Sequence, residues 1–125
     1  MVRTAPPAES SDCRAVSEIL GRVGDKWTMP VVVALHDRPH RFNELKRRVG
    51  GISQQILTST LKTLERDGMV ERTVRATTPP QVSYALTDLG HSLVNTVGQL
   101  AEWVIANLVT IHENRQRHDG RGSRP

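Results

Sequence analysis

One side of a predicted helix over residues 53–67 carries only side chains that can form hydrogen bonds or hold a positive charge. At about 100° per residue, this side collects Gln55, Ser59, Lys62 and Arg66, flanked by Thr58 and Thr63. A glutamine can pair with adenine, and a lysine can reach O6 and N7 of guanine, in the major groove of duplex DNA. The pattern therefore predicts recognition of base-pair edges by hydrogen bonds.

Contacts to a duplex are expected from three neighbouring segments. The helix supplies the candidates for base edges and nearby phosphates, namely Gln54, Gln55, Thr58, Ser59 and Lys62. Its N-terminus at Ser53 has free backbone donors, which favour a phosphate. The preceding helix supplies candidates for contacts to the DNA backbone: Arg41, Asn43, Arg47 and Arg48. A later loop supplies candidates for the minor groove or flanking phosphates: Arg75, Thr77, Thr78 and Gln81.

The basic residues are concentrated in one part of the chain, although a basic helix surface is commonly just solvated. Residues 38–75 hold nine Lys and Arg against four acids, whereas residues 76–112 hold two acids and no Lys or Arg. The formal net charge of the chain is +4, which fits a polyanionic partner. Arg66 and Arg72 have an alternative role in surface ion pairs with neighbouring acids.

Cys13 is the only cysteine, which excludes an intrachain disulfide and fits a reducing, cytoplasmic compartment. It lies at the start of a predicted helix, where the helix end can stabilise a thiolate. Oxidation could then give a bridge between two subunits, a mixed disulfide or an adduct. The alternative, which we favour slightly, is a small apolar residue in a subunit interface.

Catalytic and metal-binding patterns are absent from the sequence. It contains no G-x-S-x-G, H-E-x-x-H, P-loop or dinucleotide-binding fingerprint. His36 and His40 are four residues apart, but Pro39 intervenes and no further ligands are evident. We therefore expect a protein that is not an enzyme, without a metal or a cofactor.

Four helices are expected to precede the first strand, over residues 13–20, 25–35, 41–49 and 53–67. Asp25 and Ser53 are suitable N-caps for the second and the fourth. Ile52 and Leu57 stand at the positions of a hydrophobic staple around the start of the fourth helix. Pro30 lies in the first turns of the second helix and indicates a kink or a later start there.

Two strands are expected to follow, because residues 69–75 and 82–86 alternate between apolar and polar side chains. Pro79 and Pro80 place a loop between the strands, since proline cannot donate to a ladder. This order is that of a winged helix-turn-helix, so the predicted fold class is mainly α with a small β-wing. An alternative function is a winged-helix module that binds proteins rather than DNA. That module would carry an acidic or apolar outward side on residues 53–67, unlike the side observed.

A long last helix is expected after Thr87, which is a suitable N-cap. Its apolar stripe continues for over twenty residues, at Leu89, Leu93, Val97, Leu100, Val104, Leu108 and Ile111. One small domain can hardly cover such a helix, so we expect a partner, most simply a second copy of the chain. Trp27 and Trp103 are expected to pack in the core and in that interface, or else to line an effector pocket.

The sequence resembles the HxlR-type winged helix-turn-helix regulators, whose fold is MarR-like. The matching segments are Cys13 before a short helix, GDKWT (24–28), RFNELKRRVGGISQQILTSTLKTLERDGMVERTV (41–74) and PPQVSYALTDLG (79–90). The resemblance covers about residues 13–105 and implies a bacterial or archaeal homodimer that binds an inverted-repeat operator, usually as a repressor. Some relatives use a cysteine at the place of Cys13 to sense oxidants or electrophiles. Asp25 departs from the family, which often has glycine there.

The resemblance also implies a dimer interface built from the first and last helices. The candidate residues are Ala15, Val16 and Ile19, with Leu93, Val97, Leu100, Val104 and Leu108. The expected organisation is a flexible arm (1–12), a winged helix-turn-helix domain with dimerisation helices (13–112) and a disordered basic tail (113–125). The expected partners are double-stranded DNA, a second copy of the chain and a small-molecule or oxidant effector. No signal peptide or membrane-spanning run is evident, so we expect a cytoplasmic protein without a membrane partner.

Overall fold

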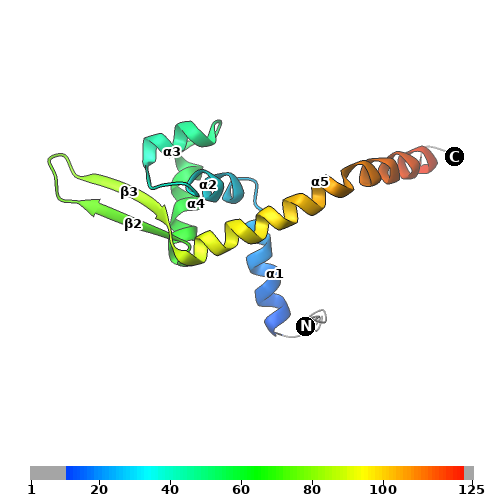
Figure 1. Ribbon diagram of the computed structural model, residues 1–125, viewed down its shortest axis with the longest axis horizontal. Coiled ribbons are helices and arrows are strands. Elements are labelled where there is room, and N and C mark those ends of the chain that lie inside the picture. Colours follow the sequence, from blue (N-terminus) through cyan, green and yellow to red (C-terminus); the bar gives the residue numbers. More distant parts are fainter. Residues whose placement is uncertain (1–10, 123–125) are drawn as a thin grey trace. The chain divides into compact units, whose positions relative to one another are not determined.

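A computed structural model describes residues 11–122 of the chain. The elements in chain order are α1 (Ser11–Val23), α2 (Thr28–Ala34), β1 (His40–Arg41), α3 (Phe42–Val49), α4 (Gln54–Arg66), β2 (Val70–Arg75), β3 (Gln81–Leu86) and α5 (Asp88–Gly122). The described residues divide into two compact units, 11–91 and 92–122. In the first unit, α2, α3 and α4 pack together, and the hairpin of β2 and β3 projects from them (Figure 1). This arrangement is a winged helix-turn-helix and confirms the predicted fold class.

The turn between α3 and α4 is short because glycine occupies its two strained positions. Gly50 and Gly51 have φ angles of +65° and +77°, a region that residues with a Cβ rarely adopt. Ser53 then caps α4, its Oγ accepting a hydrogen bond of 3.1 Å from the backbone N–H three residues later. Ile52 and Leu57, predicted at the staple positions, are both buried. The start of α4 is therefore as predicted.

The core of the first unit is built from aliphatic side chains of α2, α3, α4 and the ends of the sheet. Its members are Val31, Val32, Ala34, Leu35, Leu45, Ile52, Leu57, Leu61, Leu64, Val70 and Leu86. Each large aliphatic side chain buried in this way stabilises the fold by about 1.5–3 kcal/mol. This burial holds one side of α4 against the body of the unit and leaves the opposite side at the surface.

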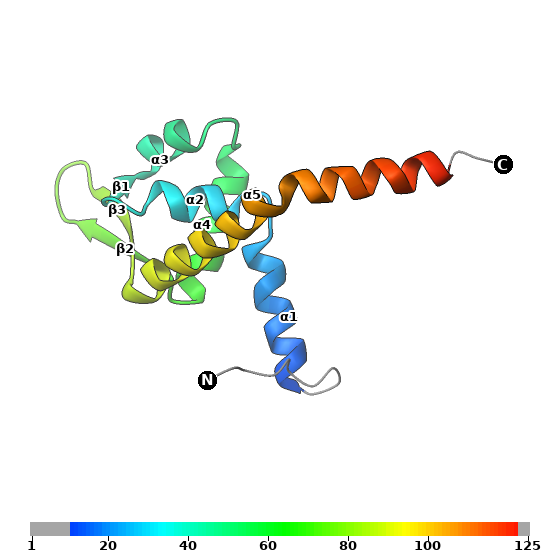
Figure 2. The same cartoon turned by 45° about the vertical axis from the view of Figure 1, so that its right-hand side comes forward.

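The sheet has three antiparallel strands in the order β1-β3-β2 (Figure 2). β2 and β3 form the predicted hairpin, in a register that runs from Val70 opposite Leu86 to Arg75 opposite Gln81. The third strand, β1, was not predicted. It has two residues, which is too short for an alternating pattern to be visible in the sequence. Its pairing with β3 nevertheless ties the start of α3 to the wing.

Helix α2 begins later than predicted, at Thr28 instead of near Asp25. Asp25 forms a local turn instead, because its Oδ2 accepts a hydrogen bond of 3.3 Å from the backbone N–H of Trp27. Pro30 then occupies the first turn, where the backbone N–H that it lacks would have no partner within the helix. The shifted start that Pro30 indicated is therefore what the structure shows.

The start of α5 is fastened to the end of α4. The hydroxyl of Thr87 donates to the carbonyl oxygen of Gly68 at 2.6 Å and accepts from the backbone N–H of Gly90 at 3.2 Å. The predicted N-cap is thus confirmed. Gly90 has no room for a side chain, because a Cβ there would collide with the backbone carbonyl of Met69. The close approach of these two segments depends on glycine at this position.

Both ends of the domain differ from the prediction. Helix α1 begins at Ser11, so the prediction of a flexible arm is wrong for residues 11 and 12. Residues 1–10 of that predicted arm lie outside the described part. Helix α5 continues to Gly122, so the expected disordered tail is wrong over residues 113–122. No proline follows the apolar stripe before residue 125, and Arg117 bonds Asn114 one turn earlier at 2.6 Å, which favours continuation of the helix. Residues 123–125 of that tail lie outside the described part.

Candidate nucleic-acid interface

The outward side of α4 is free within the described chain. Gln54, Gln55, Ser59 and Lys62 are exposed, and Thr58 and Thr63 are half-buried. These six residues line one open hollow of about 680 Å³. The predicted candidates for base contacts therefore share one continuous surface, which presents amides, hydroxyls and an ammonium group.

A second hollow, of about 740 Å³, lies between the first turns of α3 and the end of the wing. Its lining includes Arg41, Asn43 and Arg47 together with Gln81, which the sequence proposed separately as backbone and wing contacts. The antiparallel pairing of Arg41 in β1 with Ser83 in β3 brings these distant segments together. Candidate residues from two elements thus share one basic surface.

Glu44 also lines this second hollow and organises the N-terminal end of α3. Its Oε1 accepts a hydrogen bond of 3.1 Å from the backbone N–H of Arg41, and its Oε2 lies 3.5 Å from Nη1 of Arg38. The backbone N–H of Arg41, followed by the guanidinium of Arg38, lowers the pKa of Glu44 below its ordinary value. The carboxylate caps the helix and leaves the Arg41 side chain exposed toward solvent.

The wing loop holds the remaining candidates. Arg75, Thr77 and Thr78 are exposed, and Gln81 is half-buried. The hydroxyl of Thr77 donates to the carbonyl oxygen of Pro79 at 2.8 Å, so it helps to shape the loop itself. The loop therefore combines exposed polar groups with a locally fixed backbone.

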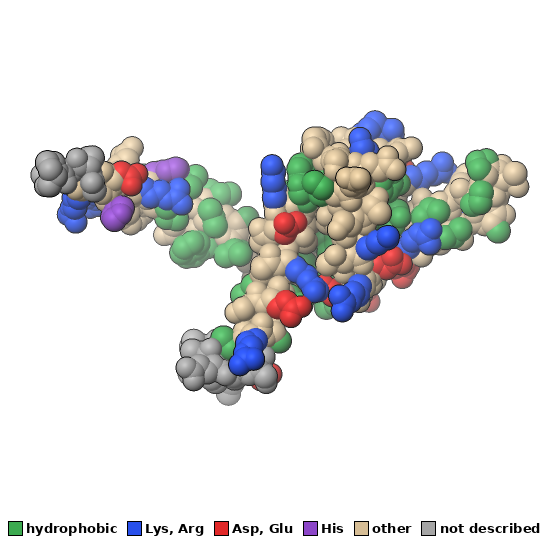
Figure 3. Space-filling model, turned by 180° about the vertical axis from the view of Figure 1, so that it is seen from behind, with side chains coloured by type: hydrophobic (Ala, Val, Ile, Leu, Met, Phe, Trp, Pro, Cys, Tyr) green, Lys and Arg blue, Asp and Glu red, His purple; other side chains and the backbone are tan. Residues whose placement is uncertain are grey.

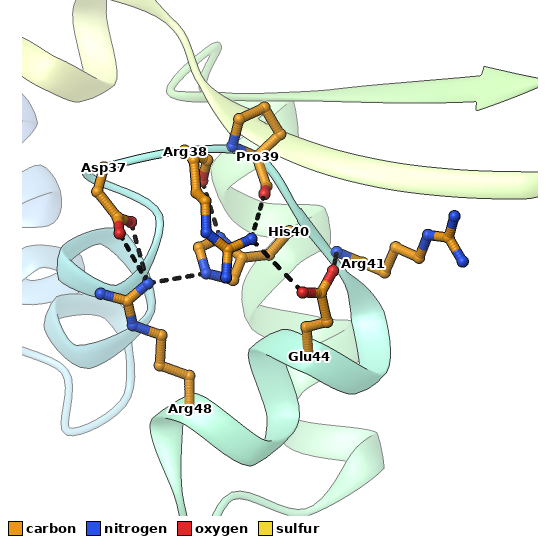
Figure 4. A network of polar contacts seen from close by, with 7 residues as sticks. All are labelled: Asp37, Arg38, Pro39, His40, Arg41, Glu44 and Arg48. Atoms are coloured by element: carbon orange, nitrogen blue, oxygen red, sulfur yellow. Dashed lines mark hydrogen bonds and ion pairs between the residues drawn. The ribbon is translucent and has the colours of Figure 1, made fainter.

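Arg48 is placed differently from the other candidates on α3. Its Nη1 lies 3.0 and 3.1 Å from the two carboxylate oxygens of Asp37 and 2.9 Å from Nε2 of His40 (Figure 4). The hydrogen bond from Arg48 lowers the pKa of Asp37 below its ordinary value. Arg48 is not among the residues that line either hollow described above. Its guanidinium is engaged within the protein, a role that its position in a basic run did not indicate.

His40 is the central residue of this cluster and was missed as a structural residue. From the sequence, His40 was considered only as a metal ligand, without further ligands to support it. In the structure its side chain is buried, with an exposed fraction of 1%. Both ring nitrogens have hydrogen-bond partners, because Nδ1 lies 2.8 Å from the carbonyl oxygen of Arg38. Nothing in the spacing of this segment distinguishes a buried histidine from an exposed one.

The apolar residues proposed for a subunit interface are largely uncovered. On α1, Val16 and Ile19 are 43% and 38% exposed. On α5, Leu100, Val104 and Leu108 are exposed, as is Trp103, whereas Leu93 and Val97 are half-buried. Hydrophobic side chains gather along α5 before its charged C-terminal end (Figure 3).

Across residues 11–122, none of the helices combines the length and the apolar character that crossing a bilayer requires.

Comparison with known proteins places these features in a family. Residues 22–112 match the family model described as HxlR-like helix-turn-helix. The chain is 40% identical over 91 residues to an uncharacterized HTH-type transcriptional regulator of Escherichia coli, YtfH, covering 73% of this chain and 72% of that protein. The solved structure of the regulator ytfH from Salmonella typhimurium is similar, with a TM-score of 0.67 and 38% identity over 81% of this chain and 90% of that one. The redox regulator HypR in its oxidized form is also similar, with a TM-score of 0.66 and 39% identity over 74% of this chain and 96% of that one.

Proposed function

The chain belongs to the HxlR-like helix-turn-helix family of DNA-binding transcriptional regulators, and from this premise we propose that it is a homodimeric repressor of an inverted-repeat operator. The observation that carries this proposal is the outward side of α4. That side offers two glutamines, hydroxyls and Lys62 to a partner, and its opposite side is held in the core. An α-helix of this kind fits the major groove, where each base pair presents a distinct pattern of donors and acceptors.

The surface shared by α3 and the wing is proposed to contact the DNA backbone. Arg41, Asn43 and Arg47 lie with Gln81 around one hollow, and Arg75 is exposed on the adjoining strand. Contacts of this type position a protein on the duplex without specifying its sequence. We assign Arg48 to the internal cluster with Asp37 and His40 rather than to this set.

Dimerisation is proposed from the uncovered apolar side chains of α1 and α5. Exposed aliphatic residues recur along both helices, with Trp103 beside them on α5, and contiguous apolar surface of this kind ordinarily marks an interface. A symmetric dimer would present two copies of α4 to half-sites roughly 34–36 Å apart, one turn of the duplex. Such a dimer explains an inverted-repeat operator.

We further propose that the protein represses transcription, acts by binding rather than by catalysis, and works in the cytoplasm. A dimer on an operator can block transcription without any reaction of its own. The polar side of α4 also favours DNA over the alternative of a protein-binding winged helix, which would expose acidic or apolar groups there.

The experiment that tests the proposal is selection of bound sequences from a random duplex pool by the purified full-length chain. We expect enrichment of an inverted repeat whose two halves are separated by about one helical turn. We also expect the affinity for the selected duplex to fall steeply with salt, because phosphate contacts release counterions. An unenriched pool would contradict DNA recognition, and enrichment of a single isolated half-site would contradict the dimer.

A second proposal concerns Cys13 and is favoured by the similarity to HypR, a redox regulator solved in an oxidized form. Cys13 is half-buried in the first turn of α1, the helix whose apolar side chains are proposed for the interface. Oxidation to a bridge between subunits or to a mixed disulfide would change the spacing of the two reading helices. Operator affinity of the wild type and of Cys13→Ser, with and without a diamide-type oxidant, tests this. Equal responses of the two proteins would leave Cys13 as an ordinary interface residue.

A further inference from the structure

His40 joins three segments of the first unit. It lies in β1, its backbone is paired with Tyr84 of β3 in the wing, and it directly precedes Arg41, which opens α3. Its side chain is 1% exposed and contacts Arg48 near the other end of α3. The imidazole therefore lies where the wing and α3 meet.

The two hydrogen bonds of the ring define its protonation state. The carbonyl oxygen of Arg38, 2.8 Å from Nδ1, can only accept, so Nδ1 carries the proton. The guanidinium of Arg48, 2.9 Å from Nε2, can only donate, so Nε2 offers its lone pair. The contacts drawn in Figure 4 therefore assign the tautomer that carries its proton on Nδ1.

Charged groups of both signs surround the ring. The charged groups come from the preceding turn and from α3: Asp37, Arg38, Glu44 and Arg48. Asp37 is occupied by Arg48, with both carboxylate oxygens within 3.1 Å of its Nη1. Glu44 is occupied by the backbone N–H of Arg41. Nε2 of His40 and the two carboxylate oxygens of Asp37 therefore hold the Arg48 guanidinium together.

We propose that His40 is a positioning residue for DNA binding, whose imidazole anchors Arg48 and keeps α3 aligned with the wing. The proposal rests on the proposed function. The consequence is geometric, because Arg41, Asn43 and Arg47 share one hollow with Gln81 only while α3 and the wing keep their present relation. Breaking the hydrogen bond between Nε2 and Arg48 removes the side-chain link between β1 and the last turn of α3.

The test compares operator affinity at pH 7.5 for the wild type, His40→Leu, His40→Gln and His36→Gln. Glutamine can accept from Arg48 through its amide oxygen, whereas leucine offers no acceptor. We expect His40→Leu to lose about tenfold in affinity, the effect of one charge-assisted hydrogen bond, and His40→Gln and His36→Gln to lose much less. His36, which is exposed, is the matched control because it lies four residues away.

Two readouts separate the outcomes. Circular dichroism shows whether each variant stays folded, and ¹⁵N spectra of labelled histidine in the wild type at pH 7.5 show whether His40 carries its proton on Nδ1. An unchanged affinity in folded His40→Leu, an equal loss in folded His40→Gln and His40→Leu, or a proton found on Nε2 would overturn the inference for His40 alone, and the last of these needs no variant. Absence of any operator binding by the wild type at pH 7.5 would instead overturn the proposed function, and the DNA part of this inference with it.

Discussion

Arg22 in the last turn of α1 and Asp67 at the C-terminal cap of α4 form a close ion pair. Nη1 of Arg22 lies 2.8 and 2.6 Å from the two carboxylate oxygens of Asp67, and Nη2 lies 3.0 Å from Glu18. The hydrogen bond and charge of Asp67 raise the pKa of Arg22 above its ordinary value. The pair fastens the first helix to the end of the helix proposed to read DNA, across 45 residues of sequence.

Removing this pair is expected to lower stability measurably. Both side chains are partly shielded, at 30% and 19% exposure, so their coupling should exceed that of an ordinary surface pair. Urea unfolding of Arg22→Ala, Asp67→Ala and the double variant measures it. The pair of Arg22 with the exposed Glu18 is the control and should couple more weakly. A coupling between Arg22 and Asp67 no larger than this control would contradict the prediction.

Substitutions on the two proposed DNA surfaces should have different consequences. Gln55→Ala is expected to cost about 1–3 kcal/mol at one operator position and to relax the base preference there. Arg47→Ala is expected to weaken binding to all duplexes alike and to reduce the salt slope by about one. Titrations of the selected operator and of single-base variants at several salt concentrations distinguish the two effects. Arg115→Ala, which removes the same charge far along α5, should change neither quantity.

A charge in the apolar stripe of α5 should separate the proposed dimer. Leu100 is 57% exposed in the single chain, and Leu100→Asp would bury an unpaired carboxylate in the interface. We expect the dimer to weaken by more than about a hundredfold, measured by sedimentation velocity. Gln99→Asp introduces the same charge on the neighbouring, exposed position outside the stripe and should leave the dimer intact. Equal sedimentation of Leu100→Asp and the wild type would be incompatible with the proposed interface.

Two glycines of α5 should respond in opposite directions to the same substitution. A Cβ at Gly90 would collide with the carbonyl of Met69, so Gly90→Ala is expected to destabilise the protein by about 1–3 kcal/mol. Gly98 has no atom within 4 Å of the corresponding position, so Gly98→Ala should stabilise the helix by about 0.5–1 kcal/mol. Thermal and urea unfolding of both variants give the sign of each change in stability directly. Destabilisation by both would show that Gly98 packs against a surface absent from the single chain.

The features predicted correctly from the sequence are those that local geometry determines. The cap at Ser53, the cap at Thr87 and the polar outward side of α4 each follow from residues within one or two helical turns. Helical periodicity and hydrogen bonding to the nearest backbone amide act at this range, so the sequence alone reveals them. The two strands of the hairpin follow in the same way from alternation on both sides of a proline-containing loop.

The features that the sequence did not predict depend on contacts between residues that are far apart along the chain. The pairing of Arg22 with Asp67 joins residues 45 positions apart, and the burial of His40 depends on β1 lying beside β3. Arg48 illustrates the difference within one helix: the sequence placed it with Arg41 and Arg47 as a basic residue, but only the fold turns it toward Asp37 and His40. A one-dimensional pattern records what a side chain is and which face of its own helix it occupies. Its partners on other elements are determined by tertiary packing, because distance along the chain sets no limit on proximity once the core has formed.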